Sequence, residues 1–299
     1  MNKINKSGFL VSCLVVVCLV SLPALTFGSG NGVKFSLRVH GGYSYLQAAD
    51  ANTGSGGWFD LYELLAAEEG WTSEGTYSPF HGGHDFGADL ILQLSPRVGV
   101  GIGVGYLQSS KTSRMTISGI DVSFLMIETP KLSAMPIRLG VFATWPLGGK
   151  WNFTANAGAA YYAAVKFSAP VRLEDGSAGE WSEQSITAKM NRLGNIGFQG
   201  GLGLEYAVSP RMFLFVEAQG RYASFKNFDT ATSAWENSSG DTSEDVGKIY
   251  LVTATLPEGT WTAFIVSEIE VAPGPEWTFR KPKFDFSGFS LQAGFRIGF

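Results

Sequence analysis

The chain has 299 residues, of which 45% are hydrophobic, 13% aromatic and only 16% charged, and 38 of them are glycines. Soluble domains usually carry about a quarter charged residues, so this composition argues against an ordinary soluble enzyme and favours a sheet with one face in lipid. The formal net charge of −4 excludes a broadly basic surface, so nucleic acid is not expected as a partner.

The first 28 residues have the layout of a secretory signal peptide. Lys3 and Lys6 precede an apolar core at Phe9–Leu22 that is short for a membrane helix, and small residues suited to cleavage end at Gly28. Both cysteines of the chain lie in this segment, so residues 29–299 are expected to form one mature domain without thiol chemistry. A lipid-attachment motif ending at Cys13 is the alternative, although most of the apolar core follows it.

Eight later segments alternate apolar and polar residues, the period of two that marks a strand with two unlike faces. They are Lys34–Tyr45, Phe86–Leu94, Val98–Tyr106, Leu132–Trp145, Trp151–Phe167, Ile196–Val208, Met212–Tyr222 and Phe286–Phe299. The predicted fold is all-β, a transmembrane antiparallel up-and-down barrel of eight strands. Ten strands are the alternative, because Lys248–Leu256 and Trp261–Val266 also alternate. We favour an exposed hairpin for these two segments.

Every charged residue in the core of these segments falls on the more polar face. Together with one histidine, they are Arg38, His40, Asp89, Arg138, Glu205, Glu217, Arg221 and Arg296. A charge on the lipid face near the bilayer centre would cost roughly 2–4 kcal/mol, so this face is expected to line the barrel interior. A packed network of ion pairs is the preferred interpretation, and a narrow polar pore is the alternative.

Short turns alternate with long connections along the chain. The turns lie at 95–97, 146–150 and 209–211, and the long segments at 47–85, 107–131, 168–195 and 223–285. This asymmetry is typical of outer-membrane barrels, with turns in the periplasm and loops outside, so both termini are expected to be periplasmic. Within the first long segment, Trp58–Glu69 predicts a short amphipathic helix ending at Gly70. We expect it to pack locally rather than on the membrane or a partner.

One cluster in the first long segment has residue types that can bind a metal or move a proton. His81, His84 and Asp85 combine two imidazoles with a carboxylate. Their spacing matches no helix-borne metal site and no nucleophile accompanies them, so hydrogen bonding at the barrel rim is the preferred interpretation. No cofactor and no catalytic residue is predicted.

The last strand carries the most specific local pattern, an alternation that runs up to a terminal aromatic residue. Its apolar positions include Phe289, Leu291, Phe295, Ile297 and Phe299. This ending resembles the assembly signal of small bacterial outer-membrane β-barrels of the OmpA, OmpX and OmpW type, and residues 197–223 resemble their penultimate hairpin. The resemblance implies an outer-membrane location and recognition of the last strand by the barrel-insertion machinery. It implies no catalytic residue.

The leading functional hypothesis is a non-enzymatic outer-membrane protein with a structural or adhesion-like role through its long extracellular segments. Outer-membrane lipids and an extracellular ligand are the expected partners. A narrow channel for small solutes is the second hypothesis, and a lipid-modifying or proteolytic enzyme at the rim is the third, since one barrel scaffold hosts unrelated functions.

Overall fold

The computed structural model describes residues 34–176, 179–190, 195–226, 228, 230–257, 259–269 and 274–299. The predicted signal peptide lies outside these residues. Residues Phe35–Phe299 form one unit, which is described below. No helix in the described part of the chain is long and apolar enough to cross a membrane.

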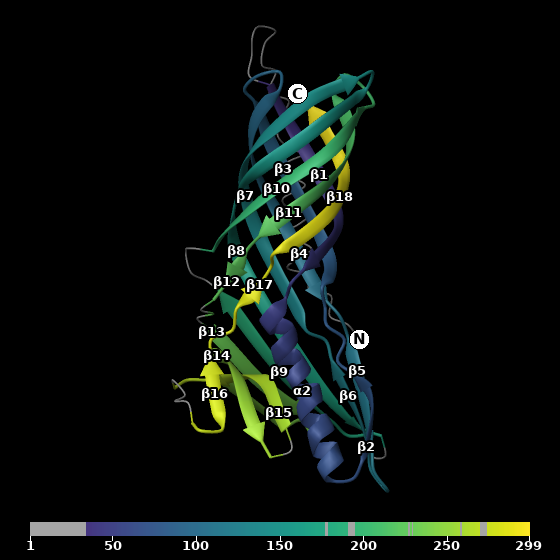
Figure 1. Ribbon diagram of the computed structural model, residues 1–299, viewed down its shortest axis with the longest axis vertical. Coiled ribbons are helices and arrows are strands. Elements are labelled where there is room, and N and C mark those ends of the chain that lie inside the picture. The colour runs from purple at the N-terminus through teal and green to yellow at the C-terminus, as the bar shows by residue number, and fades with distance from the viewer. Residues whose placement is uncertain are drawn as a thin grey trace. The chain divides into compact units, whose positions relative to one another are not determined.

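Eight antiparallel strands close into a barrel, in which each strand pairs with the next and the last returns to the first (Figure 1). In order around the ring they are β1 (Lys34–Leu46), β3 (Gly82–Gln93), β4 (Val98–Ser110), β7 (Lys131–Gly148), β8 (Trp151–Asp175), β10 (Ile196–Ala207), β11 (Met212–Tyr222) and β18 (Gly288–Gly298). The predicted eight-stranded barrel is therefore confirmed, and the ten-stranded alternative is wrong because Lys248–Leu256 and Trp261–Val266 lie outside the ring.

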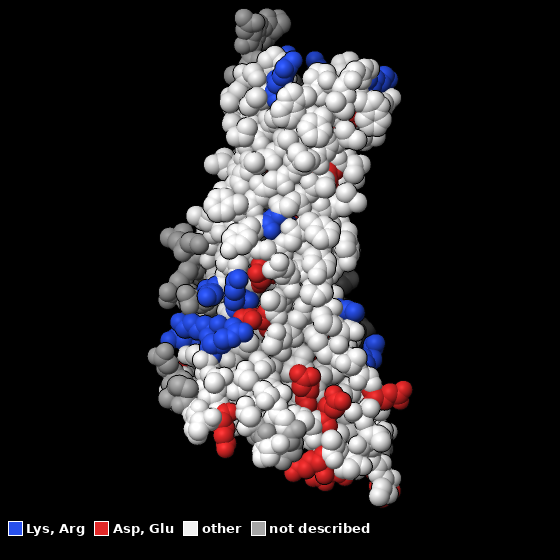
Figure 2. Space-filling view, viewed as in Figure 1, with Lys and Arg blue, Asp and Glu red and all other residues white. Residues whose placement is uncertain are grey.

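Alternation along each strand gives the barrel an apolar outer face and a polar interior, because successive side chains point to opposite faces. On the outside, Leu139, Leu202 and Leu291 are each about 60% exposed, at 66%, 59% and 60%. On the inside, Arg138 and Glu205 are buried. The outer face of the barrel is almost free of charge in the view of Figure 2.

The long segments fold into further strands rather than loops, and we call the resulting structure the distal sheet. Its strands are β2 (Thr72–Thr76), β5 (Ser113–Ser118), β6 (Ser123–Glu128), β9 (Trp181–Met190), β13 (Thr230–Asn237), β14 (Thr242–Leu256), β15 (Gly259–Ser267) and β16 (Trp277–Arg280). β8 belongs to both parts, since its distal end leaves the ring and pairs with β6 and β9. A two-stranded pair, β12 (Ser224–Phe225) with β17 (Phe284–Asp285), lies beside them.

The hairpin expected to be exposed is instead part of the distal core. It consists of β14 and β15, and Leu251, Val252 and Phe264 in it are almost fully buried. β14 also pairs with β13 and β16. The prediction of an exposed loop was therefore wrong, because these strands gain neighbours from distant parts of the chain.

The helix α2 (Ala49–Glu68) starts nine residues before the predicted helix and ends as expected, with Gly70 in the left-handed region at φ 68°. It packs along β15 and also contacts β2 and β5 (Figure 1). Glycine permits this approach, because a Cβ on Gly57 would collide with the Thr262 carbonyl oxygen. The helix thus packs locally, across the gap between the two edge strands β2 and β15.

Two apolar cores fill the distal part. The larger core includes Leu46, Ala223 and Phe286, which lie at the distal ends of barrel strands, and extends to Phe264 on β15. The smaller one packs Phe59 of α2 against Met115, Met126 and their neighbours. The larger core therefore covers the distal end of the barrel's polar interior.

Candidate functional site

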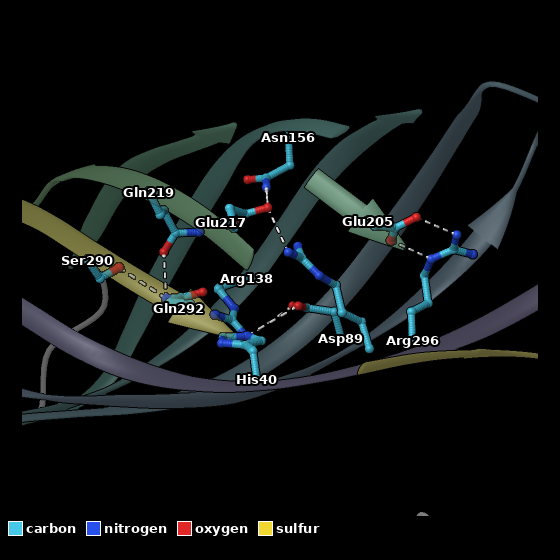
Figure 3. A network of polar contacts seen from close by, with 11 residues as sticks. His40, Asp89, Arg138, Asn156, Glu205, Glu217, Gln219, Ser290, Gln292 and Arg296 are labelled. Carbon is cyan, nitrogen blue, oxygen red and sulfur yellow. Dashed lines mark hydrogen bonds and ion pairs between the residues drawn. The ribbon is translucent and has the colours of Figure 1, made fainter. Parts of the chain in front are cut away.

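The polar interior of the barrel contains a series of ion pairs that join strands distant in the chain (Figure 3). Nearest the short turns, Arg296 on β18 makes two hydrogen bonds to Glu205 on β10, Nε to Oε1 and Nη2 to Oε2, both 2.8 Å. The Arg296 guanidinium also lies 4.1 Å from the ring centre of Phe213. A bidentate contact of this kind is among the stronger charge-assisted pairs.

The next pair joins Arg38 on β1 to Glu217 on β11. Arg38 Nη2 lies 2.6 Å from Glu217 Oε2, and Asn156 Nδ2 donates to the same oxygen at 2.8 Å. The ring of Phe215 stacks on the Arg38 guanidinium, 3.9 Å from its centre to Cζ. An aromatic side chain therefore fills space beside the ion pair that a pore would leave open.

Three side chains meet in the following layer. Arg138 Nη2 lies 3.1 Å from Asp89 Oδ1 and 2.9 Å from His40 Nε2. His40 Nε2 lies 3.5 Å from Asp89 Oδ2. Arg138 also donates to the Val104 carbonyl oxygen at 3.2 Å. Strands β1, β3 and β7 are thereby cross-linked through their inward faces.

The distal layer is centred on Arg221, which binds Asp85 and Ser44. Its Nη1 lies 2.9 Å from Asp85 Oδ2, its Nη2 donates to Ser44 Oγ at 2.7 Å, and its Nε donates to the Phe286 carbonyl oxygen at 3.0 Å. Beside these layers Gln292 donates to Ser290 Oγ at 3.1 Å. The interior thus combines four arginines with four carboxylates, those of Asp85, Asp89, Glu205 and Glu217.

The structure places all eight residues proposed for the interior inside the barrel, and adds some that the sequence analysis missed. The main additions are Asp85, Ser44, Asn156, Gln219 and Gln292. The parity of Asp85 with Asp89 could have identified it, since Asp85, Gly87 and Asp89 occupy alternate positions of one strand. The uncharged residues had no comparable signal.

The described part of the barrel interior has a small cavity at the turn end. Its volume is about 20 Å³, and it is lined among others by Ser36, Gln93, Thr144 and Arg296. Its inner wall is the Arg38–Glu217 pair with Asn156. Beyond it lie the further ion-pair layers and the larger apolar core.

His81, His84 and Asp85 do not assemble into one site. His81 Nδ1 lies 2.9 Å from the Leu46 carbonyl oxygen, and its ring stacks on Tyr45. His84 is exposed on the outer face of β3, while the buried Asp85 binds Arg221 inside. Alternation along one strand separates these two side chains. Among the described residues, no group of three or more His, Cys, Asp and Glu side chains could hold a metal ion.

A buried carboxyl group lies in the distal part, at Glu128 on β6. The residue is fully buried, and neither of its side-chain oxygens has a hydrogen-bond partner of good geometry. Burial raises the pKa of Glu128 well above its ordinary value, and the nearby Ser55 hydroxyl offsets only part of this effect. Burial and the Glu128 charge raise the pKa of Tyr77 as well. Both groups lie in the distal part, where Glu128 is fully buried and packs near Tyr77 and Ser55.

The residues expected to carry the assembly signal lie along β18. Phe289, Leu291 and Phe295 belong to the exposed apolar side chains of the barrel's outer face. Phe299 is also exposed, and its backbone N–H donates to the Phe35 carbonyl oxygen at 2.8 Å. The end of the chain is thus tied to the start of β1.

Comparison with known proteins gave only distant structural similarities. No protein-family model and no curated protein matches the chain. A major outer membrane protein from Thermus thermophilus is similar at 15% identity and a TM-score of 0.39, over 90% of this chain and 100% of that one. The outer membrane protease OmpT from Escherichia coli is similar at 10% identity and a TM-score of 0.38, over 91% and 98%.

A third structure, the outer membrane protein OprG from Pseudomonas aeruginosa, is similar at 10% identity and a TM-score of 0.31, over 90% of this chain and 96% of that one. These values are too low to transfer a residue's role. The fold described above rests on the strand pairing of the chain itself.

Proposed function

We propose that this chain is an integral outer-membrane protein whose barrel anchors the distal sheet at the cell surface, where that sheet binds another molecule or surface. The observation that carries the proposal is the folding of the long segments into one sheet and helix with their own apolar cores, continuous with barrel strand β8. A rigid platform of this kind suits recognition, because its residues are already ordered before binding.

A membrane location is supported by the two faces of the barrel wall. The outer face carries large apolar side chains on every strand of the ring, including Phe35, Leu37 and Tyr43 on β1. The charged groups of the same strands lie inside, in ion pairs. Hydrocarbon outside and satisfied polar groups inside is the arrangement that permits strands to span a bilayer.

Conduction is disfavoured by the contents of the barrel. Four ion-paired layers and the larger apolar core occupy its axis, and an eight-stranded barrel is only wide enough for side chains to fill. We therefore expect no ion current across a planar bilayer that contains the purified protein. Steady single-channel currents would favour the narrow-channel hypothesis instead.

The orientation can be tested by placing an epitope tag at each end. One tag is inserted at Gly240, in the turn between β13 and β14, and the matched control at Gly149, in the turn between β7 and β8. We expect antibody to label the Gly240 tag on intact cells and the Gly149 tag only after permeabilisation. Recovery of the processed protein in the soluble fraction after carbonate extraction would contradict a membrane location.

The surface-interaction role needs a separate measurement. Surface attachment and cell–cell aggregation are compared among cells with the wild-type protein, cells without it, and cells with Gly57→Val, which disturbs the packing of α2 on β15. We expect attachment to fall both without the protein and with the variant. Equal attachment in all three strains would refute the interaction role while leaving the membrane location intact.

A further inference from the structure

Three lysines form a basic cluster on the outer face of three neighbouring strands. They are Lys131 on β7, Lys166 on β8 and Lys189 on β9. Lys166 is directly opposite Lys189 and directly opposite Ser133, which is two residues from Lys131 on the same face. Side chains directly opposite one another have Cβ atoms about 4.5–5.5 Å apart, so the three ammonium groups can reach one small anion.

The surface around the cluster is polar and uncharged. Two rows cross strands β4, β7, β8, β9 and β13 on this face. The first row reads Ser110, Lys131, Ser168, Thr187 and Thr232, and the second reads Gln108, Ser133, Lys166, Lys189 and Thr230. The seven other residues in these rows have hydroxyl or amide side chains, and no carboxylate interrupts them. Hydroxyl groups beside lysines are suited to hydrogen-bond the oxygens of an anion.

The cluster lies at the border of the apolar band. Along β7, the outward residues that follow Lys131 and Ser133 are Met135, Ile137 and Leu139, all exposed and apolar. On β4, the Tyr106 hydroxyl donates to Gln108 in the second row at 2.8 Å. A tyrosine at this level is typical of the zone where lipid headgroups meet hydrocarbon. The lysines therefore lie at the height of the headgroups.

The positive charge of the cluster is uncompensated within the described part of the chain. None of the three lysines forms an ion pair there, whereas Arg172, farther out on β8, binds Glu174 at 2.7 Å. Lys131 and Lys189 are both close enough to repel the ammonium of Lys166. Three like charges held together on a rigid sheet are unfavourable unless an anion binds between them.

The sign of the surface charge also changes along the length of the molecule. In Figure 2, Lys and Arg lie at both ends of the almost uncharged barrel surface, with a few Asp and Glu beside those on the distal side, and further Asp and Glu gather toward the distal end. A basic zone next to the apolar band, followed by an acidic one, matches a membrane whose anionic groups lie in a single plane.

We propose that Lys131, Lys166 and Lys189 bind the phosphate groups of an anionic lipid in the outer leaflet. This inference rests on the membrane location proposed above. Lysine binds phosphate as a point charge, and a phosphate monoester carries about −1.5 to −2 charge near neutral pH. Its oxygens can accept from the ammonium groups and from neighbouring hydroxyls such as those of Ser133 and Thr230, while the acyl chains lie along the apolar face below.

The test replaces all three lysines by glutamine, in the variant K131Q/K166Q/K189Q. The matched control is R97Q/K150Q/R211Q, which removes three positive charges from the short turns at the other end of the barrel. Both variants and the wild type are purified in a neutral detergent. Binding of diphosphoryl lipid A, used as the probe, is measured by native mass spectrometry, with phosphatidylcholine as the uncharged reference and inorganic phosphate as a competitor.

We expect the lysine variant to bind lipid A on the order of 100-fold more weakly than the wild type at low salt, and the control to bind it normally. Equal loss in both variants, or no loss in either, would overturn the proposal. Full displacement of lipid A by inorganic phosphate would overturn the lipid assignment.

Folding and insertion are measured separately, by the heat-dependent gel mobility shift and by carbonate extraction. If the lysine variant loses its fold, the single variants K131Q, K166Q and K189Q replace it, and each is expected to weaken binding severalfold. Unchanged binding in all three would refute the proposal. A wild-type protein that does not enter membranes would instead contradict the proposed function, so the two failures are distinguishable.

Discussion

Arg38 on β1 and Glu217 on β11 are 179 residues apart in the chain, and their side chains meet at 2.6 Å inside the barrel, across the intervening strand β18. The exposed fractions of the two side chains are only 7% and 1%. Each therefore depends on the other for compensation of its charge. The same relationship recurs in the other layers of the interior, so barrel closure and charge compensation occur together.

Loss of one partner of this pair should destabilise the barrel strongly. Arg38→Ala leaves Glu217 buried without its cation, which typically costs about 3–5 kcal/mol of unfolding free energy. Urea unfolding in detergent micelles, followed by tryptophan fluorescence, measures the effect. Arg38→Met combined with Glu217→Met should cost less than Arg38→Ala alone. Arg172→Ala, at a half-exposed pair, is the control, with an expected cost below about 1 kcal/mol.

The buried carboxyl group of Glu128 should make the stability of the distal part depend on pH. Its pKa in the folded protein is above the ordinary 4.5, so the folded state holds the proton more tightly than the unfolded state. Unfolding free energy should therefore fall as the pH rises from about 4.5 to the folded pKa. Glu128→Gln should remove this decline, whereas Glu63→Gln on the exposed side of α2 should retain it.

Denaturation with urea at a series of pH values, followed by proteolysis of the distal part, measures this dependence. A parallel pH profile for the wild type and Glu128→Gln would show that the carboxyl group is not responsible.

Replacement of Gly57 should loosen α2 from the distal sheet. Alanine is a better helix former than glycine by about 1 kcal/mol, but its Cβ would meet the Thr262 carbonyl oxygen. Overpacking of this kind typically costs about 1–3 kcal/mol, so we expect Gly57→Ala to destabilise despite the gain in helix propensity. The rate of limited proteolysis within α2 measures this loss of stability. Gly274→Ala, where a Cβ meets nothing within 4 Å, should have little effect on stability. If Gly57→Ala were more stable than the wild type, the close contact with the Thr262 carbonyl oxygen would be wrong.

The last residue should matter more for assembly than for stability. Phe299 is 70% exposed, so its ring contributes little to packing within the barrel. If the insertion machinery reads the terminal aromatic, Phe299→Ala should lower the amount of protein that reaches the outer membrane several-fold. The unfolding midpoint of the assembled fraction should stay unchanged. Phe198→Ala on β10, at 63% exposure, is the control and should assemble normally.

Much of the barrel could be predicted from the alternation of apolar and polar residues, because successive side chains of a strand point to opposite faces. Arg138 and Glu205 could be assigned to the interior from parity alone, since a register of period two leaves them no other face. Their partners could not be assigned: that Arg296 binds Glu205 and Arg38 binds Glu217 depends on strand order and stagger around the ring.

The strand pairing of the distal sheet depends on tertiary contacts. The segment Thr230–Asn237 pairs with both β9 and β14, and nothing local in it indicates either partner. The first half of α2, Ala49–Gly57, contains three glycines that disfavour a helix by propensity. The close approach of β15 to Gly54 and Gly57 makes these two suitable. By itself, the sequence determined which side chains face outward along each barrel strand, because alternation is a local property of the backbone. Which distant strands pair and what covers the barrel was decided by packing between segments far apart in the chain.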